Sequence, residues 1–408
     1  MTMKFSVLLP TRNRSEYLRH AVETVQRQDY ADWEIVISDN CSEDDIAGIV
    51  RALGDPRIRY VRTESFVPVT DNWNNALDHS SGEYVVMLGD DDGLMPGYFS
   101  AMVGALEQFP DPDFIYTSAL FYAYPGVLPD QPQGFLRQDR NAVFTETEPF
   151  WLERERACQI ARGYLDFRMP VASNMQFSLI SRRKIDEFRR KGPFFRSPYP
   201  DFYATPALFL TSDRILIYPE PLVVIGITPK SYGYFHFNAS GSEGVQFLNN
   251  TAALSEGART SQVMLPGTSY NDSWLLAMEA LRANFAEERG MVPNYRRYRL
   301  LQILHSYKKR FFERQLPADA LKPLVERMHP IERVYSILLR IGFTVLAALP
   351  DKVFSAIERP LRQLIGQHPF QQEEYDPGPF RNLVEVYKKL DGTPRADFPQ
   401  TSATLVGA

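Results

Sequence analysis

The chain has 408 residues, of which 44% are hydrophobic and 23% charged, a composition that suits one large or two modest globular domains and excludes a disordered protein. The formal net charge of −5 gives no indication of nucleic-acid binding, so we expect no nucleic-acid partner. Two cysteines, Cys41 and Cys158, lie far apart and lack metal-ligand spacing. This usage fits a reducing compartment, and we expect a cytoplasmic protein.

The first part of the chain alternates short β-branched runs with helical periodicity, which is typical of βαβ units on a parallel sheet. The expected strands are Phe5 to Leu9, Ile35 to Ser38, Ile58 to Val61, Tyr84 to Leu88 and Phe114 to Thr117. Ser15 is expected to cap the helix after the first strand, and Asp45 to begin the helix after the second. The pattern predicts a Rossmann-like half.

Polar clusters follow three of these strands. They are Pro10 to Arg14, Asp39 to Ser42, and Gly89 to Asp92. Because ligands of open α/β sheets bind outside the carboxyl ends of the strands, we expect the three clusters to converge in space.

The third cluster holds three consecutive carboxylates, Asp90, Asp91 and Asp92, directly after an apolar strand. Adjacent carboxylates repel one another and raise each other's pKa, so a divalent cation is one way to stabilise them. The alternative is a solvated acidic turn that caps the helix announced by Pro96 and Tyr98. Taken alone, the cluster leaves both interpretations open.

The sequence from residue 122 onward predicts further segments and a division into domains. Residues 122–147, rich in Pro, Gly, Gln and Asp, are expected to be a long surface excursion, and a second mixed region follows. Helices are expected from Asp272 or Ser273 to Gly290, from Tyr295 to Leu316 and from Ile331 to Leu349. The expected division is a domain over 1–235, with halves 1–118 and 148–235, a helical region over 236–390, and a disordered tail over 391–408.

Three motifs in this order and spacing give the chain a family resemblance. They are Pro10-Thr11-Arg12-Asn13, Asp39-Asn40-Cys41-Ser42, and Gly82-Glu83-Tyr84 leading to the three aspartates, with Asn72-Trp73-Asn74-Asn75-Ala76 between them and Pro96 after them. Over residues 4–230 the sequence resembles the family 2 glycosyltransferases of the GT-A fold. The resemblance implies an α/β fold with a Rossmann-like, mostly parallel central sheet and flanking helices, to which the chain adds a helical C-terminal region.

The same resemblance implies an activity and its partners. It implies transfer of a sugar from a nucleoside diphosphate sugar donor to a hydroxyl of a glycan or lipid-linked saccharide acceptor, with inversion at the anomeric carbon. Bacterial surface polysaccharide assembly is the role that such relatives suggest. The departing diphosphate gains negative charge, which Mn²⁺ or Mg²⁺ can neutralise as a Lewis acid.

The family pattern also carries roles onto this metal site. Asp91 matches the direct metal ligand, Asp90 would face the ribose or share the metal, and Asp92 would support it. Gly89 departs from the pattern, because many relatives have an aspartate there, and this puts the ribose contact in doubt. His236, before a Gly- and Ser-containing stretch, would complete the metal shell or touch the diphosphate, with an ordinary loop residue as the alternative.

Further residues are carried over to donor binding. Asp39 matches the aspartate that accepts a hydrogen bond from a pyrimidine base, or else forms an Asx turn in its own loop. Arg12 stands where relatives often have an aromatic residue, and its guanidinium can stack on a base or bind phosphate. The expected donor-binding residues are Pro10, Thr11, Arg12, Asn13, Asp39, Ser42, Asn74, Asp90 and Asp92.

Asp201, in Tyr199-Pro200-Asp201-Phe202, matches the late acidic motif of the family. An inverting transfer needs a carboxylate that takes the proton of the acceptor hydroxyl, and Asp201 is the expected catalytic base. The alternative is an ordinary helix N-cap.

Two other functions compete with this prediction. A nucleotidyltransferase would need a Gly-rich loop after the first strand, and residues 10–14 contain no glycine. A non-catalytic protein that binds a nucleotide sugar or a glycan remains the alternative function. The sequence also allows a homo-oligomer. The apolar run from Val334 to Pro350 is too short to span a bilayer and has Arg340 in its middle, which leaves a peripheral membrane contact or a core helix.

Overall fold

The computed structural model describes residues 3–128, 131–141, 143–231, 262–349, 371–375 and 380–391. Its strands are β1 (Phe5–Thr11), β2 (Trp33–Asp39), β3 (Ile58–Arg62), β4 (Tyr84–Met87), β5 (Gly93–Leu94), β6 (Phe114–Ala123), β7 (Phe135–Arg140), β8 (Phe150–Trp151), β9 (Ser178–Ser181), β10 (Ile215–Ile227) and β11 (Gln371–Tyr375). Its α-helices are α1 (Ser15–Gln26), α2 (Ile46–Leu53), α3 (Val69–Asp78), α4 (Tyr98–Gln108), α5 (Arg154–Leu165), α6 (Arg182–Arg189), α7 (Pro200–Thr211), α11 (Ser269–Leu281), α12 (Tyr295–Phe311), α13 (Lys322–Glu326), α14 (Pro330–Leu346) and α16 (Leu383–Leu390).

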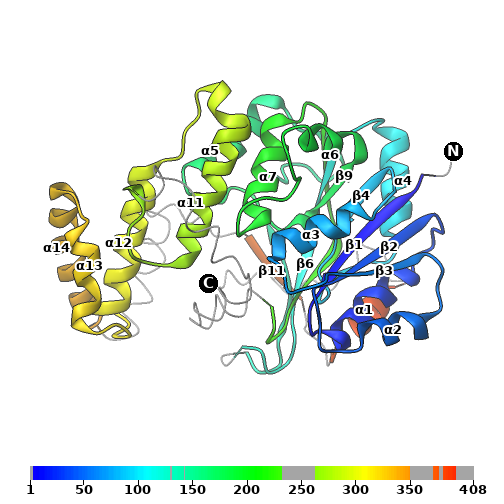
Figure 1. The fold of residues 1–408 in the computed structure, drawn as a ribbon, viewed down its shortest axis with the longest axis horizontal. Coiled ribbons are helices and arrows are strands. Elements are labelled where there is room, and N and C mark those ends of the chain that lie inside the picture. Colours follow the sequence, from blue (N-terminus) through cyan, green and yellow to red (C-terminus); the bar gives the residue numbers. More distant parts are fainter. Residues whose placement is uncertain are drawn as a thin grey trace.

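The described strands form one eleven-stranded sheet, flanked by helices (Figure 1). Its main path runs β11-β7-β6-β9-β4-β1-β2-β3, and β10 pairs with β6. The registers of β1 with β2, β1 with β4, β2 with β3, and β10 with β6 are parallel, whereas β9 runs antiparallel between β4 and β6. The chain leaves β1 toward β2 and β3 and then returns to β4 on the other side of β1. The carboxyl ends of β1 and β4 therefore flank a topological switch point, where such folds bind ligands.

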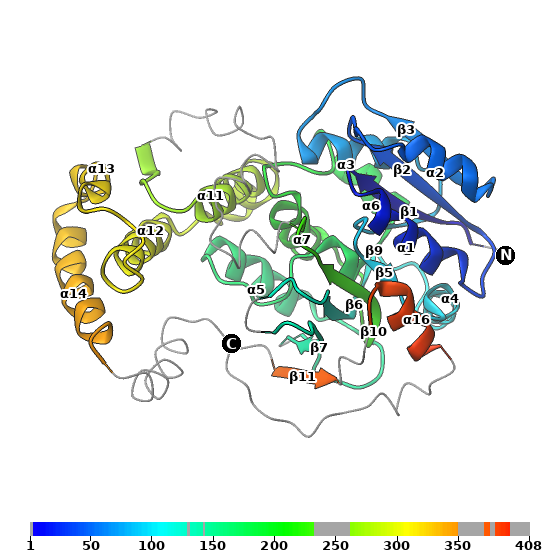
Figure 2. The same ribbon diagram turned by 90° about the horizontal axis from the view of Figure 1, so that it is seen from below.

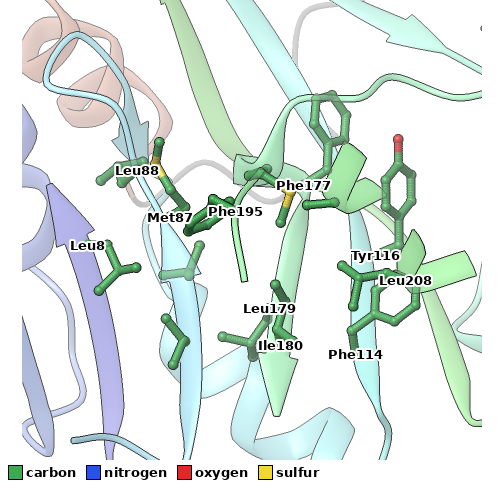
Figure 3. Packing of buried hydrophobic residues seen from close by; sticks show 14 of the residues in the cluster. Leu8, Met87, Leu88, Phe114, Tyr116, Phe177, Leu179, Ile180, Phe195 and Leu208 are labelled. Atoms are coloured by element: carbon green, nitrogen blue, oxygen red, sulfur yellow. The ribbon is translucent and has the colours of Figure 1, made fainter. Parts of the chain in front are cut away.

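Buried apolar side chains hold the sheet to its helices. β1 and β2 are buried along their whole length, and each has an uninterrupted apolar centre, Val7 to Leu9 and Ile35 to Ile37, in place of an alternating pattern. Figure 3 shows Leu8 and Met87, which are paired in register, and Phe114 and Ile180, which are paired on β6 and β9. The four expected strands before residue 90 are confirmed within two residues of their bounds. The strand expected from Phe114 to Thr117 is also confirmed, but it continues to Ala123.

Two expected helix starts are wrong and one is confirmed. Ser15 is the first residue of α1, and its backbone N–H donates to the Asp44 carboxylate at 3.1 Å, so the cap comes from the α2 loop. Thr268, and not Asp272 or Ser273, caps α11. Asp45 does cap α2, since its carboxylate accepts from the Gly48 N–H at 2.7 Å.

The segment expected to be a surface excursion contains a strand. β7 pairs antiparallel with β6 through residues 120–123, and Phe135 and Leu136 are buried. Their cross-strand partners are long-range, which is why composition alone misses them. The helical C-terminal region also includes a strand, because β11 extends the sheet antiparallel to β7.

The C-terminal part of the chain returns to the first half. Helix α16 packs beside α1, and the Tyr387 hydroxyl donates to the Arg27 carbonyl at 3.0 Å (Figure 2). Helices α11, α12 and α14 instead extend away from the sheet (Figure 1). A buried ion pair joins the last two, because Arg299 contacts both carboxylate oxygens of Glu332 at 2.7 Å. No helix among the described residues combines the length and apolarity needed to cross a bilayer.

Candidate functional site

A cavity of about 900 Å³ lies where β1, β4 and β10 end. Helices α3, α7 and α11 contribute further walls through Trp73, Asp201 and Tyr270. Its volume lies in the range of cofactor and small-molecule sites. Among the residues that the sequence predicted for the site, those that line the cavity are Pro10, Thr11, Arg12, Asn13, Asp90, Asp91, Asp92 and Asp201.

Asp90 is held by β1 and the turn that follows it. The Thr11 hydroxyl donates to one carboxylate oxygen at 2.7 Å, and the Arg14 guanidinium donates to the other at 2.7 Å. Burial raises the pKa of Asp90 above its ordinary value, while Arg14 opposes this rise. For Arg14 burial acts in the opposite direction and lowers the pKa, but the nearby carboxylates outweigh burial, so the pKa of Arg14 is raised overall. Arg14 thus supplies part of the positive charge that the aspartate cluster requires.

Asp91 faces the end of β10. Its Oδ2 accepts hydrogen bonds from the Thr228 hydroxyl at 3.2 Å and from the Ser231 hydroxyl, and it lies 3.4 Å from Arg14. β10 runs parallel to β6, so its carboxyl end arrives at the same edge of the sheet as the aspartates. The short polar run after Ile227 is therefore part of the site, which the sequence analysis missed.

Asp92 binds groups of the protein itself on the turn after β4, on β10 and on Gln176. Its carboxylate accepts from the backbone N–H groups of Gly89 at 3.0 Å and Gly226 at 2.8 Å, and from the Gln176 amide. A Cβ at position 89 would lie 2.4 Å from the Asp92 carboxylate oxygen, so this turn has no room for a side chain. In this structure the Asp92 carboxylate thus takes the space that a side chain at position 89 would need.

The described residues offer a divalent cation a limited set of ligands. Asp90 is bound to Arg14 and Thr11, Asp92 is bound to backbone amides, and no three His, Cys, Asp or Glu side chains among the described residues form a metal-binding group. Asp91 also lines the cavity, and its contacts with Thr228, Ser231 and Arg14 all fall on one carboxylate oxygen, Oδ2. Mg²⁺ is often held by one or two carboxylates together with substrate phosphates, and this donor set fits that mode. His236 lies outside the described residues.

Arg12 stacks on an aromatic ring that the sequence analysis did not connect with it. Its guanidinium carbon lies 3.7 Å from the centre of the Phe66 ring, and it donates to the carbonyls of Asn40 and Cys41 at 2.6 and 3.1 Å. Both Arg12 and Phe66 line the cavity. A planar guanidinium on a planar ring forms a surface suited to a flat ligand group.

Three predicted donor-binding residues lie outside the cavity lining. The buried Asp39 carboxylate accepts from Tyr60 at 2.7 Å and Arg62 at 2.6 Å, and Arg62 is its register neighbour on β3. The Ser42 hydroxyl accepts from the Asn13 N–H at 3.0 Å. The Asn74 side chain bonds the backbone N–H and carbonyl of Phe195. In this structure these side chains fix the loops around the site, and their contact with a donor stays a prediction.

Asp201 enters the cavity from the first turn of α7. The N-cap of that helix is Tyr199, so Asp201 is not the cap residue. Its carboxylate accepts from the Met175 N–H at 3.3 Å. Burial raises the pKa of Asp201 to about 7. A half-buried carboxyl group that titrates near neutrality is typical of acid–base chemistry.

Lys230 closes one rim of the cavity and was also missed. Its ammonium group donates to the Asn13 carbonyl at 2.8 Å, which joins the segment after β10 to the turn after β1. Asn13 has a φ of 52° and accepts from the Glu43 N–H at 2.7 Å through its side chain. Asn13 thereby links three loops at the mouth of the site.

The structure thus has a mixed α/β sheet with a cavity at its switch point and an acidic cluster after β4, which is the arrangement that the family resemblance implied. Residues 6–159 match the family model described as glycosyl transferase family 2. The family resemblance expected from the motifs is confirmed.

The chain is also similar to curated relatives and to a solved structure. The chain is 41% identical over 103 residues to a GalNAc(5)-diNAcBac-PP-undecaprenol beta-1,3-glucosyltransferase of Campylobacter jejuni, which covers 24% of this chain and 33% of the relative. It is 28% identical over 247 residues to the putative colanic acid biosynthesis glycosyl transferase WcaA of Escherichia coli K12, covering 57% of this chain and 79% of the relative. It also resembles S. aureus TarS 1–349 in complex with UDP-GlcNAc, with 16% identity, a TM-score of 0.46, and coverage of 82% and 91%.

Proposed function

We propose that the chain is an inverting glycosyltransferase that moves a sugar from a nucleoside diphosphate donor to an acceptor hydroxyl. One observation carries the proposal: a single cavity is lined both by the acidic cluster after β4 and by Asp201 of α7. Such a reaction needs one group that assists departure of the diphosphate and another that takes the acceptor proton. The family match supports the assignment of these groups to this reaction.

The donor would lie along β1 and β4. Arg12 on Phe66 would receive the nucleobase, and the cationic Lys230 would contact the diphosphate at the rim. Asp91 would hold Mn²⁺ or Mg²⁺, with Asp90 and Asp92 keeping the turn in place. When bound, the metal would neutralise charge on the leaving diphosphate.

Asp201 would accept the proton of the attacking hydroxyl. A base works best when its pKa lies near the operating pH, and the raised pKa of about 7 meets that condition. The Met175 N–H holds one carboxylate oxygen, so the carboxylate has a fixed orientation. Above neutral pH the group is ionised and competent; as the pH falls through about 7 it becomes protonated and inactive.

The acceptor would be a glycan or a lipid-linked saccharide of a bacterial surface polysaccharide, made on the cytoplasmic side. The Campylobacter relative is named for an undecaprenol-linked acceptor, which supports a lipid-linked acceptor class here. Tyr199, Phe202 and Tyr270 form an aromatic cluster beside Asp201 and line the same cavity. Aromatic faces of this kind suit the apolar faces of sugar rings.

The test is a donor panel. Release of nucleoside diphosphate from UDP-, GDP- and dTDP-sugars is measured with a mixture of polyprenyl-linked and free saccharides, with Mn²⁺ and with EDTA. The proposal expects acceptor-dependent release from one donor, lost in Asp201→Asn and retained in Asp213→Asn, whose carboxylate is 86% exposed. Equal release by the parent and Asp201→Asn would contradict the assigned base.

A further inference from the structure

The outer face of α14 carries a stripe of exposed apolar side chains. Among the described residues, all large hydrophobic side chains that are exposed, apart from Trp151 and Val292, belong to this helix. They are 56% to 72% exposed and consist of Ile331, Val334, Ile337, Leu338, Ile341 and Val345. Their spacing of three and four residues places them along one side of the helix. We call these six residues the α14 stripe.

The opposite side of α14 is fixed to the protein. Phe343 is buried in a cluster with Ile303 and Tyr307 of α12, and Leu339 packs against that cluster. The buried pair of Glu332 with Arg299 holds the first turn of the helix. The core-helix alternative therefore holds for one face of α14 only. The helix itself lies beyond α12 at the outer end of the molecule (Figures 1 and 2).

The part of the chain that contains α12 and α14 is mostly positive in charge. Residues 295–346 contain eleven Lys or Arg and four Asp or Glu, in a chain with a net charge of −5. The acidic residue of α14, Glu332, is buried in its ion pair, whereas Arg333 and Arg340 are exposed. These two arginines are seven residues apart, so they share one line along a margin of the stripe.

We infer that the α14 stripe and its cationic margin dock the protein on the surface of an anionic phospholipid bilayer. The 17-residue helix is about 25 Å long, shorter than a hydrocarbon core, and would lie in the interface plane. Apolar side chains would enter the acyl boundary while the arginines contact phosphate headgroups. The inference stands on this surface alone and goes beyond the proposed reaction.

Charge favours a bilayer over a second copy of the chain. A twofold dimer through the stripe would place the same surface of each copy against the other. Arg333 and Arg340 of one copy would then lie close to the same arginines of the other, so like charges would face each other. An anionic bilayer complements that charge, and each basic residue near its surface adds to binding.

The test is sedimentation of the full chain with vesicles, without donor or acceptor. Vesicles of phosphatidylcholine are compared with vesicles that also contain phosphatidylglycerol, at low salt and at about 1 M salt, where the screening length is about 3 Å. The stripe variant combines Ile337→Ser, Leu338→Ser and Ile341→Ser. The control is Val292→Ser, because Val292 is 58% exposed but lies outside α14. Circular dichroism melting verifies that both variants stay folded.

The parent and the control are expected to sediment with the anionic vesicles and to be released by salt. The stripe variant is expected to bind at least about tenfold more weakly. Equal binding by the parent and the stripe variant would overturn the inference, as would a parent that binds neither vesicle. Light scattering that shows a dimer in the parent and a monomer in the stripe variant, with no vesicle binding, would assign the stripe to a second copy instead. Diphosphate release with a water-soluble acceptor should be equal in parent and stripe variant, so this test and that of the reaction fail independently.

Discussion

Replacing Asp201 by Asn should make the protein more stable and much less active. Burial raises the pKa of this carboxyl from its ordinary 3.8 to about 7 in the folded protein. Each pKa unit corresponds to 1.36 kcal/mol, so the ionised carboxylate costs up to about 4 kcal/mol of folding free energy. An amide carries no charge, and its oxygen can still accept the hydrogen bond of the Met175 N–H.

The pKa of Asp201 in the unfolded and in the folded protein determines how its contribution to stability changes with pH. Between pH 3.8 and about 7 the folded state binds a proton that the unfolded state has lost, so the contribution of Asp201 to stability falls as the pH rises through this range. The stability advantage of Asp201→Asn should therefore approach about 4 kcal/mol above pH 7 and vanish near pH 4.

Urea unfolding of both proteins at about pH 8 and about pH 4 measures this difference. Asp213→Asn serves as the control, because it removes an exposed carboxylate from the loop that follows α7. In the same variants, transfer should fall by about 10²- to 10⁴-fold in Asp201→Asn while donor binding is retained. A stability difference that is equal at both pH values, or that favours the parent at pH 8, would refute the reasoning.

Three further substitutions, one with its own control, test the donor side and the turn that carries it. Asp91→Asn should reduce turnover at least about a hundredfold, and full turnover of the parent in EDTA would contradict the metal assignment. Gly226→Ala should destabilise the folded protein by more than about 2 kcal/mol, because its Cβ would lie 1.8 Å from the Asp91 carbonyl oxygen. The control Gly104→Ala lies in open space on α4 and should stabilise the protein by about 0.5–1 kcal/mol. Thermal melts that rank the two variants otherwise would count against the described turn. Lys230→Met should raise the KM for the donor more than it lowers kcat, and an unchanged KM would remove Lys230 from diphosphate binding.

Local patterns were sufficient to predict much of the fold and part of the site. The strands before residue 90 follow from apolar runs bounded by polar turns, and β1 and β4 end where the motifs begin. The convergence of Thr11 with Asp90 follows from parallel pairing of these strands and is confirmed by their hydrogen bond. The placement of Asp201 in the same cavity came from the family motif, not from periodicity.

Long-range partners account for what could not be predicted. Asp39 lies at a strand end like Asp90, but its register neighbour on β3 is Arg62, which binds its carboxylate. Phe66 reaches Arg12 from a loop more than fifty residues away in the sequence, and no periodic signal marks it. The Thr228 and Ser231 hydroxyls could have been suspected, because they follow an apolar strand whose end meets the aspartates.

The division of work between Asp91 and Asp201 is the central claim, and calorimetric titration of the donor into the two Asn variants tests it most directly. The account predicts that, with Mn²⁺ present, the donor binds Asp201→Asn about as tightly as the parent and binds Asp91→Asn at least about tenfold more weakly. Tight binding to Asp91→Asn together with lost binding to Asp201→Asn would contradict it.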